Sequence, residues 1–277
     1  MKIKKGIALL LALVMTLALA ACTQTPPPSR TDGEGTALPD EGYSAGNVDI
    51  VQLNGFRSIN IDWTSGFVTV ELYDGQGIEL SETMMDGSDV ALKMEWRVDE
   101  DDSTLDILSQ PLTVSASQKK HLTAKLPRSM VLHELDIHTV SADVSVDLTE
   151  EDTLTLQELD VSSVSGNVSV SAANAGEISL STTSGAVSGS VRTAKLEADT
   201  VSGTVALTLE VLPTELEVET VSGGVALTLT EKTSVPVDVV FRTVSGQLDS
   251  DVDSTVGADC VWEIETTSGD AVIRIAA

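Results

Sequence analysis

The sequence predicts an all-β fold: a parallel β-solenoid or closely related stack of about eight strand–bend–strand rungs, with a β-rich capping insertion after the first rung. Three observations support this. Short runs of Val, Thr, Ile and Leu alternate with Asp, Glu and Ser, as in strands with one buried face. A Ser-Gly pair or close equivalent recurs about every 20 residues over the second half of the chain. The parity of the inward residues changes at each recurrence.

The repeats are aligned on the serine of each bend. The aligned serines are Ser65, Ser141, Ser165, Ser184, Ser202, Ser222, Ser245 and Ser268. A unit this short cannot close its own core, so it must stack on its neighbours. A twisted antiparallel sandwich is the alternative, and it would explain the alternation but not the fixed phase of the bends.

One repeat shows the change of parity clearly. Leu216, Val218 and Thr220 are inward before the bend, whereas Val225 and Leu227 follow it with the opposite parity. Side chains strictly alternate along a strand, so one extra residue must be absorbed at the bend. We expect the glycine to absorb it through a positive φ or a bulge, and the Thr and Ser hydroxyls to stack in ladders inside the bend.

The repeat lapses between residues 73 and 134, which we predict to form a β-rich insertion that caps the first rungs. The other end has no such segment, because the chain stops after Ile275. We therefore expect an open sheet edge there, with end-to-end self-association as one consequence.

The N-terminus predicts a lipoprotein signal peptide over residues 1–21. A basic start precedes the apolar stretch from Ile7 to Ala21, and the sequence Leu-Ala-Ala before Cys22 resembles a bacterial lipobox. The resemblance implies that Cys22 is lipidated and anchors the protein to the membrane; an ordinary secretory cleavage site with a chance cysteine is the alternative. Residues 22–47, rich in Pro, Gly, Ser and Thr, form the predicted flexible stalk, and residues 48–277 form the β-repeat domain.

The formal net charge of −27 argues against a nucleic-acid partner and against electrostatic attraction to anionic lipid. Such acidity either keeps a protein soluble or recruits divalent cations and basic partners. Beyond Cys22 the only other cysteine is Cys260, so no intramolecular disulfide framework is expected. We interpret Cys260 as a small buried apolar residue.

Several motifs together carry a family resemblance. They are Ile61-Asp62-Trp63-Thr64-Ser65-Gly66, Val68-Thr69-Val70-Glu71, Leu105-Asp106-Ile107, the segment from Leu122 to Pro127, and the later Thr-Val-Ser-Gly bends. This pattern resembles the bacterial "putative adhesin" domain of unknown function, a β-strand-repeat family similar to the toast-rack domains of envelope-stress proteins. The resemblance covers most of residues 48–277 and implies fold and surface location. Adhesin is a label by analogy in that family, so no functional residues are carried over.

Catalysis is not expected. A serine nucleophile needs a base within hydrogen-bond reach, and the histidines are His121, His133 and His138. His138 has the outward parity, so we expect it to point away from Ser141. A polysaccharide-active enzyme, common among parallel β-helix proteins, would need aromatic platforms for sugar rings. Aromatic residues make up 3% of the chain, and Trp63 and Trp262 occupy inward positions.

We predict no cofactor and no metal site. Asp249, Asp251 and Asp253 alternate like the start of a calcium loop, but Ser254 and Cys260 stand where such a loop needs glycine and glutamate. A looser cation site between acidic turns stays open as an alternative. His133 and His138 are expected on opposite faces of a strand, which argues against a zinc pair.

One outward feature is a candidate interaction stripe. An apolar residue stands between the inward Thr or Ser and the bend serine in five repeats: Val140, Val164, Val201, Val221 and Val244. Threonines 64, 183 and 267 interrupt it. Either the valines bind a partner, or they reflect strand propensity with partial cover from neighbouring turns.

The sequence as a whole predicts a non-enzymatic lipoprotein, extracytoplasmic and anchored to the bacterial cell membrane. Its repetitive scaffold would serve adhesion, binding or structural duty in the envelope, with a protein or an envelope polymer as partner. The alternative is a sensory or regulatory accessory role in envelope stress, which only the toast-rack resemblance suggests. A polysaccharide-active enzyme is the third possibility.

Overall fold

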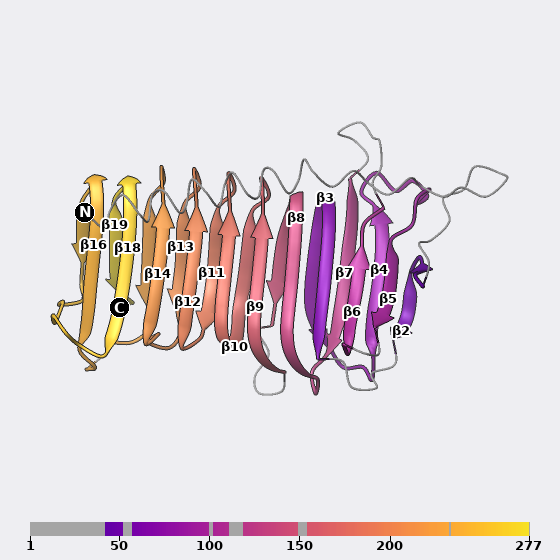
Figure 1. The fold of residues 1–277 in the computed structure, drawn as a ribbon, viewed down its shortest axis with the longest axis horizontal. Coiled ribbons are helices and arrows are strands. Elements are labelled where there is room, and N and C mark those ends of the chain that lie inside the picture. The colour runs from indigo at the N-terminus through magenta and orange to yellow at the C-terminus, as the bar shows by residue number, and fades with distance from the viewer. Residues whose placement is uncertain are drawn as a thin grey trace.

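The computed structural model describes residues 42–51, 57–99, 102–110, 119–148, 154–232 and 234–276, and all regular structure in these ranges is β-strand. The strands stack side by side into an elongated rod (Figure 1). The predicted all-β class is confirmed. Within the described ranges, no helix is long and apolar enough to cross a membrane. The predicted signal peptide, Cys22 and most of the stalk lie outside the described residues.

The rod is built from two kinds of strand, short ones that occupy one side and long ones that continue around a bend. In chain order the strands are β1 (Ser44–Ala45), β2 (Val48–Val51), β3 (Ser58–Tyr73), β4 (Ile78–Met84), β5 (Glu95–Asp99), β6 (Thr104–Leu108), β7 (Lys120–Pro127), β8 (Val131–Asp147), β9 (Thr155–Ser163), β10 (Val168–Thr182), β11 (Val187–Arg192), β12 (Lys195–Thr200), β13 (Val205–Leu209), β14 (Glu215–Thr220), β15 (Val225–Leu229), β16 (Val237–Ser245), β17 (Leu248–Ser250), β18 (Cys260–Ser268) and β19 (Ala271–Ile275).

The pairings divide the rod into two sides, here named sheet one and sheet two. Sheet one runs in space through β5, β6, the first half of β3, the first half of β8, β9, the second half of β10, β12, β14, β18 and β16. Sheet two runs through β4, β7, the second halves of β3 and β8, the first half of β10, β11, β13, β15, β19 and β17. Most pairs are parallel, so the antiparallel sandwich is ruled out.

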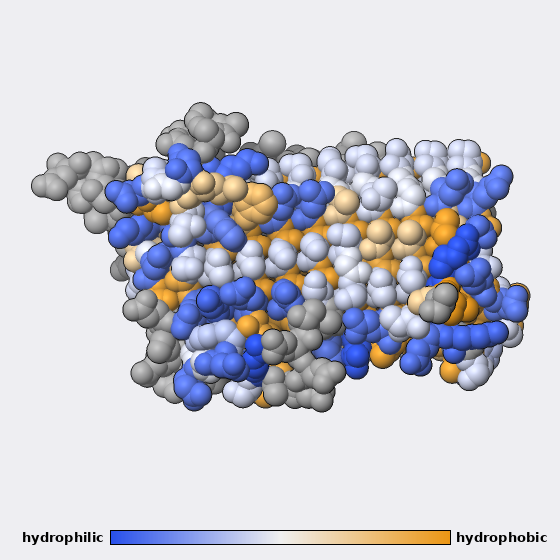
Figure 2. Space-filling view, turned by 180° about the vertical axis from the view of Figure 1, so that it is seen from behind, coloured by the Kyte–Doolittle hydropathy of each residue, from blue (hydrophilic) through white to orange (hydrophobic). Residues whose placement is uncertain are grey.

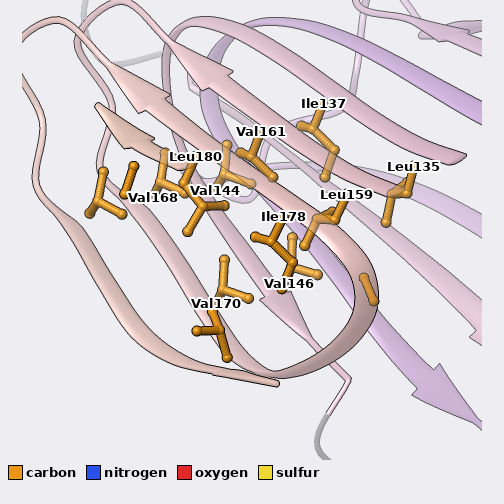
Figure 3. Close-up of a cluster of buried hydrophobic side chains, with 14 of the residues drawn as sticks. Leu135, Ile137, Val144, Val146, Leu159, Val161, Val168, Val170, Ile178 and Leu180 are labelled. Carbon is orange, nitrogen blue, oxygen red and sulfur yellow. The ribbon is translucent and has the colours of Figure 1, made fainter. Parts of the chain in front are cut away.

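The core lies between the two sheets and repeats from rung to rung. Parallel pairing in register places Leu216 between Leu196 and Trp262 on sheet one. Equivalent residues of successive rungs therefore lie above one another. Figure 3 shows this for Ile137, Val161 and Leu180, which lie on successive strands and are fully buried. Because every rung buries the same alternate positions, neighbouring rungs pack by the same contacts.

The order of rungs along the rod differs from their order in the chain. Strand β18 pairs with β14 on one side and with β16 on the other, and β19 likewise lies between β15 and β17. The rung of β16 and β17 therefore ends the stack, although it precedes the last two strands in sequence (Figure 1). The expected open edge after Ile275 is wrong: β19 is covered on both sides.

The other end of the rod is closed by antiparallel strands. Strands β6 and β7 stack outside β3, then β5 pairs antiparallel with β6 and β4 with β7. The short strands β1 and β2 pair antiparallel with β5 and β4. All of β4 to β7 falls within residues 73–134. A buried ion pair holds this region together, with Lys120 Nζ 2.7 Å from Glu82 Oε1, and Glu82 Oε2 accepts a hydrogen bond from Met94 N at 2.8 Å.

A hydroxyl ladder runs inside the bends. Gly203 N donates to Thr200 Oγ1 in its own rung at 3.0 Å, and Thr200 Oγ1 donates to Gly185 O in the rung below at 3.3 Å. Thr182 makes the same two bonds, to Gly185 N and Gly166 O. Thr182 and Thr200 thus each satisfy two backbone groups of the bend, which would otherwise be costly to bury, whereas the buried Thr220 Oγ1 has no hydrogen-bond partner among the described residues. The predicted ladder of inward threonines is confirmed.

The bend serines do not form a second inner ladder, which corrects that expectation. All eight aligned serines are exposed or half-buried at the outer surface of the bend. Their hydroxyl groups bond to carbonyl groups of the adjacent bend instead. Ser165 Oγ donates a hydrogen bond to Val140 O at 3.2 Å, and Ser202 Oγ donates one to Thr183 O at 3.4 Å. The change of parity therefore occurs at the serine: the serine and the residue before it both point outward.

The glycines of the bends are needed for close packing rather than for a left-handed backbone. Only Gly66 among them has a positive φ, of 107°. A Cβ on Gly203 would lie 1.7 Å from Gly185 O, and a Cβ on Gly223 would lie 1.7 Å from Gly203 O. Each glycine thus lies directly against the bend carbonyl of its neighbour, where no side chain fits. The expected role of positive φ is wrong for the other bends.

We predict that Gly203→Ala destabilises the protein by at least ~2 kcal/mol, because the new methyl group meets backbone that cannot move aside without shifting a rung. Chemical denaturation followed by circular dichroism measures this.

Gly224→Ala is the matched control in the neighbouring rung. A Cβ there has its nearest contact at 3.7 Å, from Asp270 O, so we expect a change of less than ~1 kcal/mol. Equal losses in the two variants would contradict the packing explanation.

Candidate functional site

Three surfaces run along the rod and could bind a partner: the outer edge of the bends, the outer face of sheet one and the outer face of sheet two. Each has a chemistry that repeats with the rungs. The predicted valine stripe lies on the bends. Val244 is 69% exposed and Val140 44%, whereas Val164, Val201 and Val221 are half-buried. Together with the exposed serines, the stripe is a mixed edge of methyl and hydroxyl groups.

The outer face of sheet one is acidic. Strands β12, β14 and β18 pair in register and point their alternate side chains outward. The outward carboxylates on these strands are Glu197, Asp199, Glu215, Glu217, Glu219, Glu263 and Glu265. Neighbouring strands are about 4.8 Å apart, so carboxylates of successive rungs face one another at close range. Two basic residues lie among these carboxylates: Lys195 forms an ion pair with Glu177, and Arg242 forms one with Glu263.

Burial, together with repulsion from neighbouring carboxylates, raises the pKa values of Asp199, Glu217 and Glu219. Burial, followed by repulsion from Glu197 and Glu219, raises the pKa of Asp199 to about 8. Burial and the neighbouring Glu217 raise the pKa of Glu219 to about 7. Burial, followed by repulsion from Glu197 and Glu263, raises the pKa of Glu217. Asp199 is only 9% exposed, and its Oδ1 has no hydrogen-bond partner among the described residues. This face therefore holds protons near neutral pH.

The outer face of sheet two is different in kind. Strands β10, β11, β13 and β15 present short, uncharged side chains here, and we name this surface the hydroxyl face. Its residues are Ser169, Ser171, Ser188, Ser190, Ala206, Thr208, Ala226 and Thr228. Figure 2 shows it as a pale band across the middle of the rod, with apolar core atoms between and blue side chains toward both ends. Pairing across β11, β13 and β15 is regular, whereas the register of β10 with β11 shifts between Val170 and Ala173.

The histidines do not assemble a catalytic group. His138 lies outward, as predicted, and its Nδ1 is 2.6 Å from Ser162 Oγ in the next rung. Asp62, Asp136 and Asp160 each interact electrostatically with His138. Burial is the main cause of the raised pKa values of Asp62 and Asp160. No carboxylate within the described residues is hydrogen-bonded to the other ring nitrogen of His138. His121 Nε2 bonds Thr69 Oγ1 at 2.8 Å. The pair of Ser162 and His138 thus lacks the orienting acid of a triad.

The aspartates resembling a calcium loop serve the end of the rod. Asp249 forms an ion pair with Arg274, and Asp251 Oδ1 lies 3.6 Å from Arg274 Nη1. Asp251 Oδ2 also accepts a hydrogen bond from Ile275 N at 3.2 Å. Within the described ranges, no group of three or more His, Cys, Asp or Glu is arranged to hold a metal ion. Cys260 is a buried free thiol at 7% exposure.

Sequence reasoning missed the hydroxyl face and the coupling of the carboxylates. The signal for the hydroxyl face was available: Ser-x-Ser in two repeats and Ala-x-Thr in the next two stand at the outward positions after the bend. Their significance depends on the parallel register, which sets these short pairs side by side. The coupled carboxylates depend on the same register on the other sheet.

We predict that the protein becomes less stable as pH rises from about 4 to about 8. The folded-state pKa of Asp199 lies above the ordinary value, so the folded chain binds more protons than the unfolded chain in this window, and unfolding is favoured as they are lost. Asp199→Asn removes the contribution of this carboxyl group. We expect its melting temperature at pH 8 to exceed that of the unmodified protein by ~3 °C or more, with little difference at pH 4.

The exposed Asp253 provides the control. Asp253→Asn removes the same charge away from the acidic face, so we expect it to leave the loss of stability between pH 4 and pH 8 in place. A wild-type melting temperature that rises between pH 5 and pH 8 would contradict the explanation.

Comparison with known proteins places the chain in a family. Solved structures that are similar include a "putative adhesin" from Bacteroides fragilis, with 14% identity, 86% of this chain and 99% of that chain covered, and a TM-score of 0.49. Another is a "putative cell adhesion protein" from Clostridium sporogenes, with 13% identity, 84% and 100% coverage, and a TM-score of 0.44. A "putative adhesin" from Parabacteroides distasonis has 13% identity, 84% and 97% coverage, and a TM-score of 0.45.

No curated protein is significantly similar to the chain. The family described as Toastrack DUF4097 matches residues 59–275, from the first inward residues of β3 to the last residue of β19. This range contains both sheets, the bends and all three repeating surfaces. The protein therefore belongs to the Toastrack DUF4097 family.

Proposed function

We propose that the protein is a non-enzymatic, lipid-anchored scaffold of the bacterial envelope that binds an extended envelope polymer across the hydroxyl face. The observation that carries this proposal is a surface of short, uncharged side chains, repeated from rung to rung, on a chain of net charge −27. Charged side chains elsewhere keep water bound, whereas short hydroxyl and methyl groups are cheaper to desolvate.

The lattice of the hydroxyl face suits a repeating ligand. Rungs follow one another at about 4.8 Å, and outward residues on one strand are about 6.6 Å apart. A polymer that crosses the strands meets the same pair of groups at each rung, Ser188 and Ser190, then Ala206 and Thr208, then Ala226 and Thr228. Hydroxyl groups both donate and accept hydrogen bonds, and their short side chains lose little rotamer entropy on binding.

The names printed for similar solved structures speak of adhesion, which is said of those proteins. Within the described residues, His138 and His121 bond to Ser162 and Thr69 without the orienting acid of a catalytic triad. The rod supplies what adhesion requires, namely a stiff body with a long repeated surface.

We predict that charges on the hydroxyl face abolish binding to the polymer. The double variant Ala206→Glu with Ala226→Glu places two carboxylates at exposed positions of β13 and β15. We expect at least a ~10-fold loss of co-sedimentation with insoluble cell-wall polymer, because each carboxylate must be desolvated on contact. The measurement is the bound fraction of purified protein against polymer concentration, with released soluble sugar assayed in parallel.

The control is Ser202→Glu with Ser222→Glu, which adds the same charge to the same rungs at the exposed bend. It should bind like the unmodified protein. Loss of binding only in this control would shift the site to the valine stripe, and release of soluble sugar would contradict a non-enzymatic role.

The anchor is tested separately. We expect Cys22→Ser to prevent incorporation of a labelled fatty acid and to release the protein from the membrane fraction, because the acyl chains supply the membrane affinity. Undiminished labelling of the variant would exclude Cys22 as the lipidated residue. The unmodified protein in the same cells is the reference.

A further inference from the structure

We propose that two copies of the protein associate tail to tail, by antiparallel pairing of the rung formed by β16 and β17 with the same rung of a second copy. This inference is independent of the proposed polymer binding, since it concerns the end of the rod rather than the hydroxyl face.

The last rung offers backbone groups that earlier rungs pair with their neighbours. On sheet one, Val221 N donates to Thr200 O at 3.3 Å, and Thr183 N donates to Ser163 O at 3.1 Å. The equivalent carbonyl in β16 belongs to Thr243, and the described residues supply no donor to it. On sheet two, Val205 N donates to Gly224 O and Val225 N to Asp270 O. The equivalent amide in β17 belongs to Leu248, which also has no acceptor among the described residues.

The chain itself covers only the first part of this edge. Ser254 Oγ accepts from Val239 N at 3.0 Å, and Thr255 N donates to Val237 O at 2.8 Å. These bonds show that Val237 and Val239 direct their backbone groups to the free end. Because alternate residues of a strand point the same way, Phe241 and Thr243 also direct theirs outward, beyond the reach of this loop.

The core is unfinished at the same place. Trp262 and Ile264 of β18 are fully buried, whereas their neighbours Val239 and Phe241 in β16 are only half-buried. Leu248 of β17 is likewise half-buried, while its neighbour Ala271 in β19 is fully buried. An unpaired strand edge with apolar side chains is a template for another strand.

The occupant is a second copy of this end rather than the opposite end of the rod. The opposite end finishes in the antiparallel strands β1 and β2, of two and four residues, and very short edge strands are a device that blocks further pairing. An open edge that occurs once per molecule forms a closed two-fold dimer, in which identical strands run antiparallel.

Charge also favours this rung over the rest of the rod. The outward residues of β16 are Asp238, Val240, Arg242 and Val244, whereas those of β14 are Glu215, Glu217, Glu219 and Val221. Arg242 Nη1 lies 2.7 Å from Glu263 Oε2 and also pairs with Glu265, and Arg274 pairs with Asp249. The two arginines neutralise acids at the rung where two copies of this acidic chain must approach each other.

The test compares Thr243→Pro with Thr243→Ala in the purified full-length chain. Both variants lose the hydroxyl that accepts from Thr266 Oγ1 at 2.9 Å. Only proline removes the outward amide and obstructs the edge, and it costs no bond to β18 because that amide faces away. By sedimentation equilibrium we expect the unmodified protein and Thr243→Ala to dimerise, and Thr243→Pro to dimerise at least ~10-fold more weakly.

Amide hydrogen exchange supplies a readout that needs no variant. With rising protein concentration, the amides of Phe241, Thr243 and Leu248 should become protected, whereas exchange elsewhere in the strands should not change. A protein that stays monomeric at high concentration, filaments instead of dimers, or concentration-independent exchange at these three amides would overturn the proposal. So would equal dimerisation of the proline and alanine variants.

Discussion

The contact on which the rest of the structure depends is the meeting of each bend glycine with the bend carbonyl of the adjacent rung. Gly203 lies so close to Gly185 O that no Cβ fits between them, and Thr200 bonds to both glycines. This contact holds successive bends at one spacing and one phase. With the bends aligned, the strands on either side have no freedom of register, because a shift of one residue would expose the core side chains.

The fixed register gives the rod two chemically distinct faces. On sheet one it stacks the carboxylates of β12, β14 and β18, and burial with repulsion from neighbouring carboxylates raises the pKa of Asp199 to about 8. On sheet two it gathers serine, threonine and alanine into the hydroxyl face. Neither face is a property of one strand. Each arises because a modest pattern within one repeat is copied at about 4.8 Å intervals.

Much of the fold could be predicted because the repeat is local. The alternation Leu216, Val218, Thr220 identifies both the strand and its buried face, and the burial of these residues agrees. The orientation of the serines could not be predicted. Parity shows that one extra residue is absorbed at the bend, but it does not show which residue points outward. In the structure two consecutive residues do: Val221 is half-buried and Ser222 is exposed.

The surroundings of the valine stripe and of His138 also could not be predicted from a single repeat. The valine stripe is present at the bends, but its exposure varies from rung to rung, since Val244 stands at the end of the rod and Val221 between two neighbours. His138 points outward as its parity requires, yet its partner Ser162 belongs to the next rung and is 24 residues away in sequence. Contacts between rungs are invisible in one repeat, because they depend on which repeats are neighbours.

The sequence by itself determined the β-class, the positions of the bends and the buried apolar positions of each strand, since all of these depend on spacing within one repeat. Only the tertiary structure decided the order of the last rungs. Residues of β14, β16 and β18 would all fit the same register, so local pattern does not rank them. Trp262 and Ile264 need apolar neighbours on both sides, and Trp262 Nε1 donates to Pro213 O beside β14 at 3.0 Å. The half-buried Phe241 tolerates the end of the stack, so β18 lies inside and β16 remains at the edge.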